Sequence, residues 1–447
     1  MSWSSRFVAE ALGLPEGPAL EFSEVSTDTR TLQPGALFVA LVGERFDGHD
    51  HLARARDAGA SAAVVRKGTA PVAGLPLLEV DDTLKGYGRL ARARRRQISG
   101  PVVAVTGSNG KTSTKEMVAA VLGTGYIVHA TRLNLNNLVG IPQTILAAPA
   151  GTNALVIEAG ASTPGEIARA REIIEPTVAI ITNVGDSHLE GFGSRNGVMQ
   201  EKLALLTDVA LGVVGTDPPD LGRQARSRAK RVLTGGLKDS DVTPSSLTLD
   251  GSGRPRFTVD GVEVLLPIRG QHQAGNAMLA WALVRELSLD RKRAAEALSA
   301  LTLPGGRGEV LQVGGLTIMN DAYNANPASF RTAIATAQAM RRGRRLVFIA
   351  GSMRELGKDA RRFHHEIAGE LAALNPDILG VVGDFVPAIQ PHAEVLGARL
   401  IRASDPIALG PLLKDRLQGN ELVVLKASRG VQLERILPFL GAPIEAH

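Results

Sequence analysis

The sequence contains no cysteine, which excludes disulfides, thiolate metal sites and cysteine nucleophiles. No apolar run approaches the roughly 18 residues that a membrane-spanning helix needs, so we expect no insertion into a membrane. Residues 1–13 lack a basic stretch followed by an apolar core, and we therefore expect no secretory signal. These absences favour a cytoplasmic protein.

Aromatic residues make up only 4% of the chain, too few for the base-stacking surfaces of proteins that bind single-stranded nucleic acid. The net charge of +5 is small for 447 residues. We expect no nucleic-acid partner and favour polyanionic small molecules. The densest basic cluster lies near the end of a predicted helix, where we expect a solvated face that complements the helix C-terminus: Arg89, Arg92, Arg94, Arg95 and Arg96.

The length of the chain exceeds what one hydrophobic core usually holds. Alternating strand and helix patterns predict an α/β fold in three units. Residues 1–98 form a small α/β unit, residues 99–304 a parallel mononucleotide-binding sheet with a small antiparallel excursion, and residues 305–447 a Rossmann-like unit. The third unit has no Gly-x-Gly-x-x-Gly turn, so we predict no nicotinamide or flavin site. Residues 164–174, with Pro164 in the first turn, and 432–437 are predicted helices.

The most informative stretch is TGSNGKT at residues 106–112, between an apolar strand at 101–105 and an amphipathic run at 113–122. Strand, glycine-rich loop and helix make a phosphate-binding loop. Gly107 and Gly110 let backbone N–H groups turn toward phosphate oxygens, and the helix N-terminus adds its dipole. Lys111 can neutralise the β- and γ-phosphates, and the Thr112 hydroxyl can bind Mg²⁺. Val105 stands where the ordinary pattern has glycine, and the alternative is a tightly packed turn without a ligand.

Two polar residues follow predicted parallel strands of the same unit. Glu158 ends the strand at 154–157, and His188 comes after the strand at 177–182. Ligands of such sheets bind at the carboxyl ends of the strands, where the phosphate loop also lies. Both residues are therefore candidate Mg²⁺ ligands, directly or through water. For either residue alone, a helix-capping glutamate or a hydrogen-bonded histidine would be the better interpretation.

With these motifs, the chain resembles the Mur ligases, ATP-dependent enzymes that add amino acids to the peptidoglycan precursor. The resemblance covers essentially the whole chain and rests on TGSNGKT, a variant phosphate loop that accounts for Val105, and on three further motifs in the family's order: EAG at 158–160, NVGDSH at 183–188 and GQHQAGN at 270–276. Four stretches resemble the members that join D-alanyl-D-alanine to UDP-N-acetylmuramoyl tripeptide: 43–50, 134–142, 188–194 and 321–327.

The resemblance implies a role for each matching residue. It implies catalytic roles for Lys111, Glu158, His188 and Lys202. One Mg²⁺ would be bound by Thr112 and Glu158 and a second by His188. Lys202 would carry a carbamate, although by itself it would pass for a helix-surface lysine. ATP would be bound by Gly107, Ser108, Asn109, Gly110, Lys111, Thr112, Ser113, Asn276, Arg307 and Asp321. The UDP-sugar peptide and the dipeptide would be bound by Thr27, Asp28, Thr29, Arg30, Asn134, Asn136, Asn137, Asn324 and Asn326.

The implied reaction proceeds through an acyl phosphate formed on the tripeptide carboxylate by a monomeric enzyme. Two departures from the family pattern, Ser352 and Ala427, lie in the third unit, where the dipeptide is expected. One alternative is a Mur-type ligase that adds a diamino acid or a glutamate, against which the Asn-Ala-Asn-Pro stretch at 324–327 argues. Another is a P-loop ATPase or nucleotide-binding protein without ligase activity.

Overall fold

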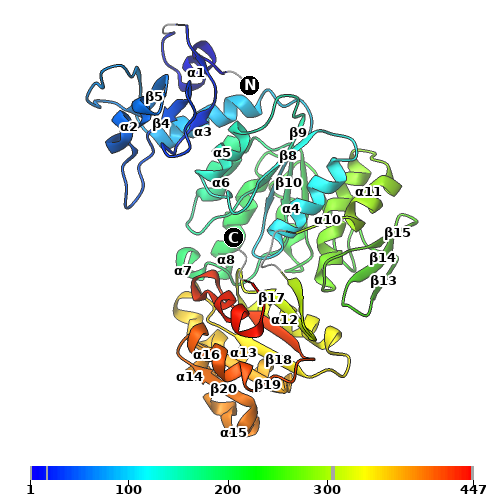
Figure 1. Cartoon of the computed structure of the whole chain (residues 1–447). Coiled ribbons are helices and arrows are strands. Elements are labelled where there is room, and N and C mark those ends of the chain that lie inside the picture. The colour runs from blue at the N-terminus through cyan, green and yellow to red at the C-terminus, as the bar shows by residue number, and fades with distance from the viewer. Residues whose placement is uncertain (1–2, 17–18, 304–307, 444–447) are drawn as a thin grey trace.

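The computed structural model describes residues 3–16, 19–303 and 308–443. Three α/β units follow one another along the molecule, in the order of the chain (Figure 1). Each of the three is built on a sheet with parallel strands, and the central unit carries an additional small antiparallel sheet. The predicted fold class is confirmed. No helix within the described ranges combines the length and the apolar character needed to cross a membrane.

The first unit contains a parallel sheet in the order β3 (Val25–Ser26), β4 (Leu37–Val39), β5 (Ala62–Arg66) and β6 (Leu77–Val80). A short antiparallel pair, β1 (Trp3–Ser4) and β2 (Glu21–Phe22), lies beside it. The apolar side chains of β4 and β5 are buried on both faces, as expected for a parallel sheet covered by helices. The main helices are α1 (Ser5–Leu12), α2 (Leu52–Asp57) and α3 (Thr83–Arg95).

The central unit has six parallel strands in the order β12 (Val232–Thr234), β11 (Leu211–Val214), β10 (Val178–Ile181), β7 (Val102–Thr106), β9 (Ala154–Glu158) and β8 (Val128–Ala130). The predicted strands are β7, β9 and β10; β8, β11 and β12 were not predicted. The helices are α4 (Lys111–Leu122), α5 (Gly140–Leu146), α6 (Glu166–Ile174), α7 (Leu189–Phe192), α8 (Arg195–Leu203), α9 (Leu221–Ala225), α10 (His272–Glu286) and α11 (Arg291–Ser299). Helix α6 begins after Pro164, with Gly165 as its N-cap, so the predicted first-turn proline is wrong.

The predicted antiparallel excursion is confirmed as β13 (Ser246–Leu249), β14 (Pro255–Val259) and β15 (Val262–Leu265). Its inner side chains share one core with α4, α10 and α11. Helix α10 is therefore buried over most of its length, and its Trp281 is completely buried.

The third unit orders its strands β16 (Glu309–Val313), β17 (Leu316–Asp321), β21 (Leu422–Lys426), β18 (Leu346–Ala350), β19 (Ile378–Val382) and β20 (Leu400–Ala403), of which only β16 pairs antiparallel. The α-helices are α12 (Pro327–Arg341), α13 (Ala360–Ala373), α14 (Phe385–Ala388), α15 (Ala393–Leu396) and α16 (Pro406–Lys414). The helix predicted at 432–437 is present, but it is a 3₁₀ helix at Leu433–Leu440 that contains Pro438. Proline cannot donate the hydrogen bond that an α-helix needs there.

The arginine cluster joins the first two units, which corrects the predicted solvated face. Arg92 and Arg96 form ion pairs with Glu175, the C-cap of α6. Arg95 donates to the carbonyl oxygens of Ile174 and Glu175, so the cluster complements the C-terminus of a neighbouring helix rather than that of α3. Hydrogen bonds from Arg96 and Arg92 lower the pKa of Glu175 to about 2. Arg94 is 3% exposed and donates to the carbonyl oxygen of Ala148.

Candidate active site

The TGSNGKT loop connects β7 to α4 as predicted, and two glycines allow its course. Gly107 has φ +150°, and a Cβ at this residue would lie 1.8 Å from Thr182 Oγ1. Gly110 is the left-handed N-cap of α4 and packs against the side chain of Asn276. No side chain caps α4, so its first turn directs backbone N–H groups outward, as in helix N-termini that bind phosphate.

The first half of the loop is attached to the segment after β10. The N–H groups of Ser108 and Asn109 donate to Asn183, at its backbone oxygen and its Oδ1, both at 3.0 Å. Thr182 Oγ1 donates to the carbonyl oxygen of Asn109 at 2.5 Å. These two N–H groups are therefore engaged within the protein, and an anion would meet the loop at the start of α4, from Gly110 to Ser113.

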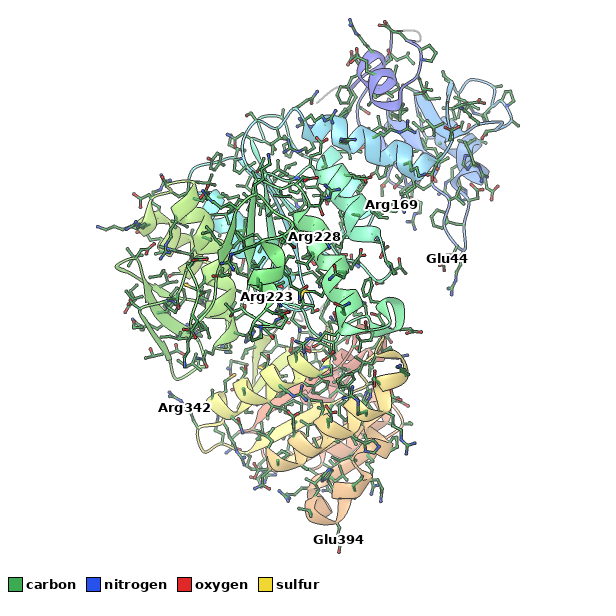
Figure 2. All side chains as sticks on the ribbon, turned by 180° about the vertical axis from the view of Figure 1, so that it is seen from behind. Glu44, Arg169, Arg223, Arg228, Arg342 and Glu394 are labelled. Carbon is green, nitrogen blue, oxygen red and sulfur yellow. The ribbon has the colours of Figure 1, made fainter. Side chains whose placement is uncertain are left out.

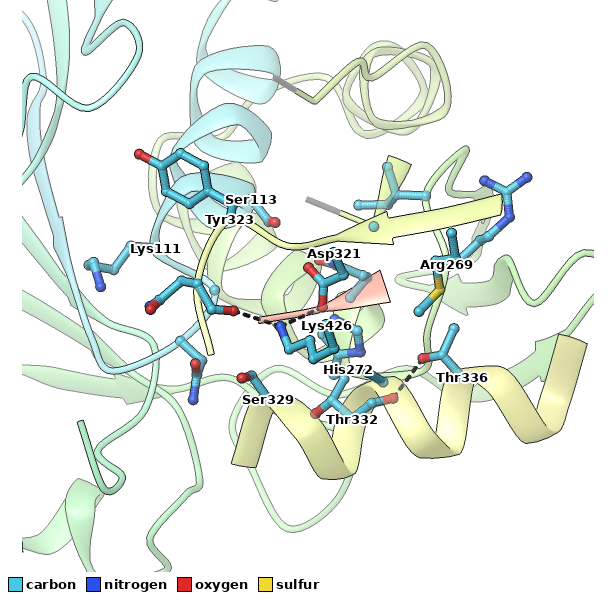
Figure 3. Close-up of a pocket in the computed structure, with 18 of the residues that line it drawn as sticks. Lys111, Ser113, Arg269, His272, Asp321, Tyr323, Ser329, Thr332, Thr336 and Lys426 are labelled. Carbon is cyan, nitrogen blue, oxygen red and sulfur yellow. Dashed lines mark hydrogen bonds and ion pairs between the residues drawn. The ribbon is translucent and has the colours of Figure 1, made fainter. Parts of the chain in front are cut away.

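Lys111 extends beside this loop, and its Nζ donates to the carbonyl oxygen of Gly107 at 2.9 Å. A cavity of about 160 Å³ lies here between the central and third units (Figure 3). Lys111, Ser113 and His272 line it from the central unit, and Asp321 and Lys426 from the third. The Lys426 Nζ donates to Asp321 Oδ2 at 2.6 Å and to the Asn324 carbonyl oxygen at 2.8 Å.

Glu158 is 1% exposed, and its carboxylate is held from both sides. The Thr112 hydroxyl donates to Oε2 at 2.7 Å, and Asn136 Nδ2 donates to Oε1 at 2.9 Å. The Glu158 N–H donates to Thr131 Oγ1, which fixes the backbone. A carboxylate next to a threonine hydroxyl at a phosphate loop is a suitable set of oxygen donors for Mg²⁺. The predicted association of Thr112 with Glu158 agrees with this geometry.

His188 does not join that pair of oxygen donors. It adopts a left-handed conformation, with φ 51°, at the start of α7, and its Nδ1 forms an ion pair with Glu355 of the third unit. The interaction with His188 lowers the pKa of Glu355. Within the described ranges no group of three or more His, Asp or Glu side chains is arranged to bind a metal ion. The structure thus places His188 at a contact between units.

Lys202 belongs to α8 and is 1% exposed. Burial, with the nearby positive charge of Lys111, lowers the pKa of Lys202 to about 7. Its Nζ makes no hydrogen bond or ion pair with any residue that the structure describes. The neighbouring Glu201 does not pair with Lys202. Its carboxylate instead accepts hydrogen bonds from the N–H groups of Gly165 and Ile167 at the start of α6.

The remaining predicted nucleotide residues lie around the same loop. Asn276 lines a second cavity, of about 1080 Å³, which also borders Asn109 and Gly110. Its Nδ2 donates to Gln273 Oε1 at 3.1 Å. Asp321 lines the smaller cavity and is paired with Lys426. Arg307 lies outside the residues that the structure describes.

Asn326, predicted to bind substrate, connects the third unit to the phosphate loop. Its Nδ2 donates to Asn109 Oδ1 at 2.8 Å, and Asn109 Nδ2 donates back to Asn326 Oδ1 at 3.3 Å. Asn326 is also the N-cap of α12, where it forms a capping box with Ser329. Asn324 lines the smaller cavity. The amide pair joins two sequence motifs that are separated by 217 residues.

We expect Asn326→Ala to lose both the N-cap of α12 and the amide pair with Asn109. The free energy of unfolding should fall by about 1–2 kcal/mol, the usual cost of losing an N-cap. Asn326→Ser should keep the cap and lose only the amide pair. Because the pair holds Asn109, both variants should bind ATP more weakly, by about threefold to tenfold. Urea denaturation and calorimetric ATP titration measure the two effects.

The control for these variants is Asp405→Ala, which removes the N-cap of α16 in the same unit. It should lower stability without changing ATP affinity. If Asn326→Ser bound ATP as tightly as the unmodified chain, the amide pair would have no role in ordering the loop.

The predicted UDP-sugar residues occupy two separate places. Thr27 and Asp28 line a cavity of about 650 Å³ between the first unit and the C-terminal end of α5. Hydrogen bonds from Arg30 lower the pKa of Asp28 to about 2. Thr29 lies in the same turn and is partly buried. Asn136 contacts Glu158 instead, and Asn137 Oδ1 accepts from the N–H groups of Val139 and Gly140 at the start of α5. Asn134 accepts the Asn136 N–H at its carbonyl oxygen.

Comparisons with known proteins agree with this arrangement. Three family models match successive parts of the chain: the catalytic domain of the Mur ligase family at 21–95, the Mur ligase middle domain at 105–284, and the Mur ligase glutamate ligase domain at 306–429. The UDP-N-acetylmuramoyl-tripeptide--D-alanyl-D-alanine ligase of Bacillus subtilis is 35% identical, over 98% of this chain and 97% of its own length. This chain belongs to the Mur ligase family. The resemblance inferred from its motifs is confirmed.

Solved Mur ligase structures share the whole architecture. MurF from Acinetobacter baumannii superposes with a TM-score of 0.88 at 29% identity, covering 98% of this chain and 99% of that one. The MurF ligase of Thermotoga maritima, solved in complex with ADP, has a TM-score of 0.81 at 30% identity, covering 93% and 96%. The predicted arrangement of three α/β units is therefore found in solved members of the family.

The motifs assigned no role to three residues that this Mur ligase places at or beside the loop, although Asn183 opens the NVGDSH motif. Lys426 lies on a buried strand, where an ammonium is rare unless paired, and that burial was the available signal. Asn183 and Glu355 make their contacts with residues far away in the sequence, and nothing local in the sequence indicates such partners.

Proposed function

We propose that this chain is an ATP-dependent ligase that joins D-alanyl-D-alanine to UDP-N-acetylmuramoyl tripeptide. The observation that carries the proposal is the TGSNGKT loop with Lys111, Thr112 and Glu158 at the start of α4, in a chain that aligns along its whole length with a ligase of that name. We assign residues 1–98 to the UDP-sugar peptide, 99–304 to ATP and 305–447 to the incoming dipeptide.

In the proposed reaction, the terminal carboxylate of the tripeptide attacks the γ-phosphorus of ATP. The bond to the bridging oxygen breaks, ADP leaves and an acyl phosphate forms. Lys111, with the N–H groups that start α4, offsets the negative charge that gathers on the phosphates. The amine of the dipeptide then attacks the acyl carbon, inorganic phosphate leaves, and the amine loses a proton. No side chain needs to act as a covalent nucleophile.

Thr112 and Glu158 fit a Mg²⁺ ion, which when bound would shield the phosphate charge and orient the phosphates. Their hydroxyl and carboxylate oxygens lie 2.7 Å apart beside the loop, and Asn136 holds the second carboxylate oxygen. We further propose that Lys202 reacts with CO₂ to form a carbamate, supported by its burial and its lowered pKa. We also propose that the protein is monomeric and works in the cytoplasm.

The test is phosphate release from ATP and Mg²⁺ with UDP-muramoyl tripeptide and D-alanyl-D-alanine, each supplied or omitted. Release should require both substrates, and mass spectrometry should find the pentapeptide product. Glutamate and diaminopimelate in place of the dipeptide test the alternative Mur ligase activities. Release that is indifferent to the tripeptide would contradict the ligase and indicate an ATPase.

A further inference from the structure

Lys115 is a charged side chain that the fold buries almost completely. Charged side chains usually project from the surface of a protein, as the labelled Glu44, Arg342 and Glu394 do in Figure 2. Lys115 lies on α4, and only 1% of it is exposed. A buried ammonium is costly even when it is paired, and an apolar side chain would fill the same space at less cost. The lysine therefore calls for a reason other than packing.

The contacts of Lys115 close a ring around the carboxylate beside the phosphate loop. Its Nζ donates to the carbonyl oxygen of Thr131, directly after β8, at 2.7 Å and forms an ion pair with Glu116. Thr131 Oγ1 accepts the N–H of Glu158 at 3.0 Å. The Glu158 carboxylate returns to α4, because the Thr112 hydroxyl donates to it at 2.7 Å. Thr112 and Lys115 lie about one turn apart on that helix.

The segment after β8 is also attached to the end of β9. The Thr131 N–H donates to the carbonyl oxygen of Val156 at 3.0 Å, and the Gly160 N–H donates to that of Asn136 at 2.8 Å. Asn136 Nδ2 holds Glu158 Oε1 at 2.9 Å. Residues 131–136 thus wrap around the carboxylate, and a shift of this segment would carry Glu158 with it.

Burial makes this ring rigid. None of its four members, Thr112, Lys115, Thr131 and Glu158, is more than 1% exposed, so water cannot replace a contact that is lost. Lys115 therefore sets where residues 131–136 lie against α4, and α4 carries Thr112. The positive charge of the lysine is matched by Glu116, so what it supplies to the ring is a donor at a fixed place.

We propose that Lys115 is a positioning residue for the Mg²⁺ ligands, which acts through Thr131 to hold the Glu158 carboxylate beside the Thr112 hydroxyl. The proposal rests on the proposed function, in which these two residues bind the ion together with ATP. Residues that orient metal ligands usually change metal affinity by about 10-fold to 100-fold when they are replaced. Lys115 itself touches neither the ion nor the nucleotide.

The test is calorimetric titration of the full-length protein with ATP, once with Mg²⁺ and once with EDTA, in the absence of the tripeptide. Lys115→Met keeps an apolar side chain of similar length and removes the donor. It should weaken ATP binding about tenfold with Mg²⁺ and leave binding in EDTA unchanged. Ligation by this variant should need about tenfold more Mg²⁺ for half of its maximal rate, and excess Mg²⁺ should restore it.

Thr131 provides a second, independent pair of variants. Thr131→Val removes only the hydroxyl that accepts the Glu158 N–H, and it should weaken ATP binding with Mg²⁺ as Lys115→Met does. Thr131→Ser keeps the hydroxyl and should bind ATP as the unmodified chain does. This pair carries the test if Lys115→Met does not fold.

The matched control is Arg94→Met. Arg94 is also a buried cation that donates to a backbone carbonyl oxygen, that of Ala148, and it has no contact with the ring. Urea denaturation should show a loss of stability for both Arg94→Met and Lys115→Met. Only Lys115→Met should lose ATP affinity, and only with Mg²⁺.

The outcomes separate the two proposals. An equal loss of ATP affinity with Mg²⁺ and with EDTA would mean that Lys115 shapes the phosphate loop, and unchanged affinity in both would mean that it only packs; either result overturns the positioning role. If the unmodified chain binds ATP more tightly with Mg²⁺ but does not ligate, the proposed function fails and the positioning role stands. If it binds no ATP, both fail.

Discussion

Lys111→Ala is expected to lower the rate of ligation by about three orders of magnitude, the usual loss when a charge that stabilises a transition state is removed. The Lys111 Nζ lies at the loop, 2.9 Å from the Gly107 carbonyl oxygen. A phosphoryl group in transfer spreads negative charge over its oxygens, and alanine leaves that charge without its lysine. The measurement is phosphate release with both substrates present, under saturating ATP.

The variant should remain folded, because it removes one partly exposed side chain and leaves the loop's hydrogen bonds to Asn183 in place. Lys292→Ala, an exposed lysine of α11, is the matched control and should be fully active. Ligation by Lys111→Ala at more than a tenth of the normal rate would mean that the phosphates bind elsewhere.

Much of the fold could be predicted because its signals are local. The strand before the phosphate loop, the loop and the helix after it are adjacent in the sequence, and each has its own pattern of apolar residues and glycines. Glu158 ends β9, and its place beside the phosphate loop could be predicted because ligands of parallel sheets bind at the carboxyl ends of the strands. Short strands such as β8 and β12 were missed, because three residues cannot show a period of two.

The contacts that complete the site were beyond prediction, because they join segments that are distant in the sequence. The resemblance implied that Ser108 and Asn109 bind ATP, yet the backbone N–H groups of both residues donate to Asn183. Asn136 was expected at the substrate and is hydrogen-bonded to Glu158. A motif specifies which residue types occur together, but not which of them share a hydrogen bond after folding.

The same distant contacts bring two units together at one place. The Asn109–Asn326 pair, the His188–Glu355 ion pair and the hydrogen bond from the Glu190 N–H to the Glu355 carbonyl oxygen all join the central and third units beside the phosphate loop. Closure around the loop would keep water from an acyl phosphate, which hydrolyses readily. These contacts therefore link the arrangement of the units to the stability of the proposed intermediate.

Lys202→Met is expected to lower ligation by about three orders of magnitude and to abolish any response to bicarbonate, if Lys202 carries the proposed carbamate. The unmodified chain, depleted of CO₂, should lose activity and regain it when bicarbonate is added. Only the neutral amine attacks CO₂, and it releases one proton in doing so. Because the pKa of Lys202 is lowered to about 7, the reactive form is plentiful above pH 7 and is lost as the pH falls below it.

The pH dependence of folding stability gives an independent check on the lowered pKa of Lys202. The folded-state pKa of Lys202 is lower than the ordinary value of 10.5, so the unfolded chain binds more protons between pH 7 and 10.5, and stability rises with pH across that window. Lys202→Met removes the buried charge and should flatten that rise without unfolding the chain. The matched control is Lys115→Met: Lys115 is equally buried but donates to the Thr131 carbonyl oxygen, so this variant should keep the bicarbonate response. A Lys202→Met enzyme that still responded to bicarbonate would contradict the carbamate.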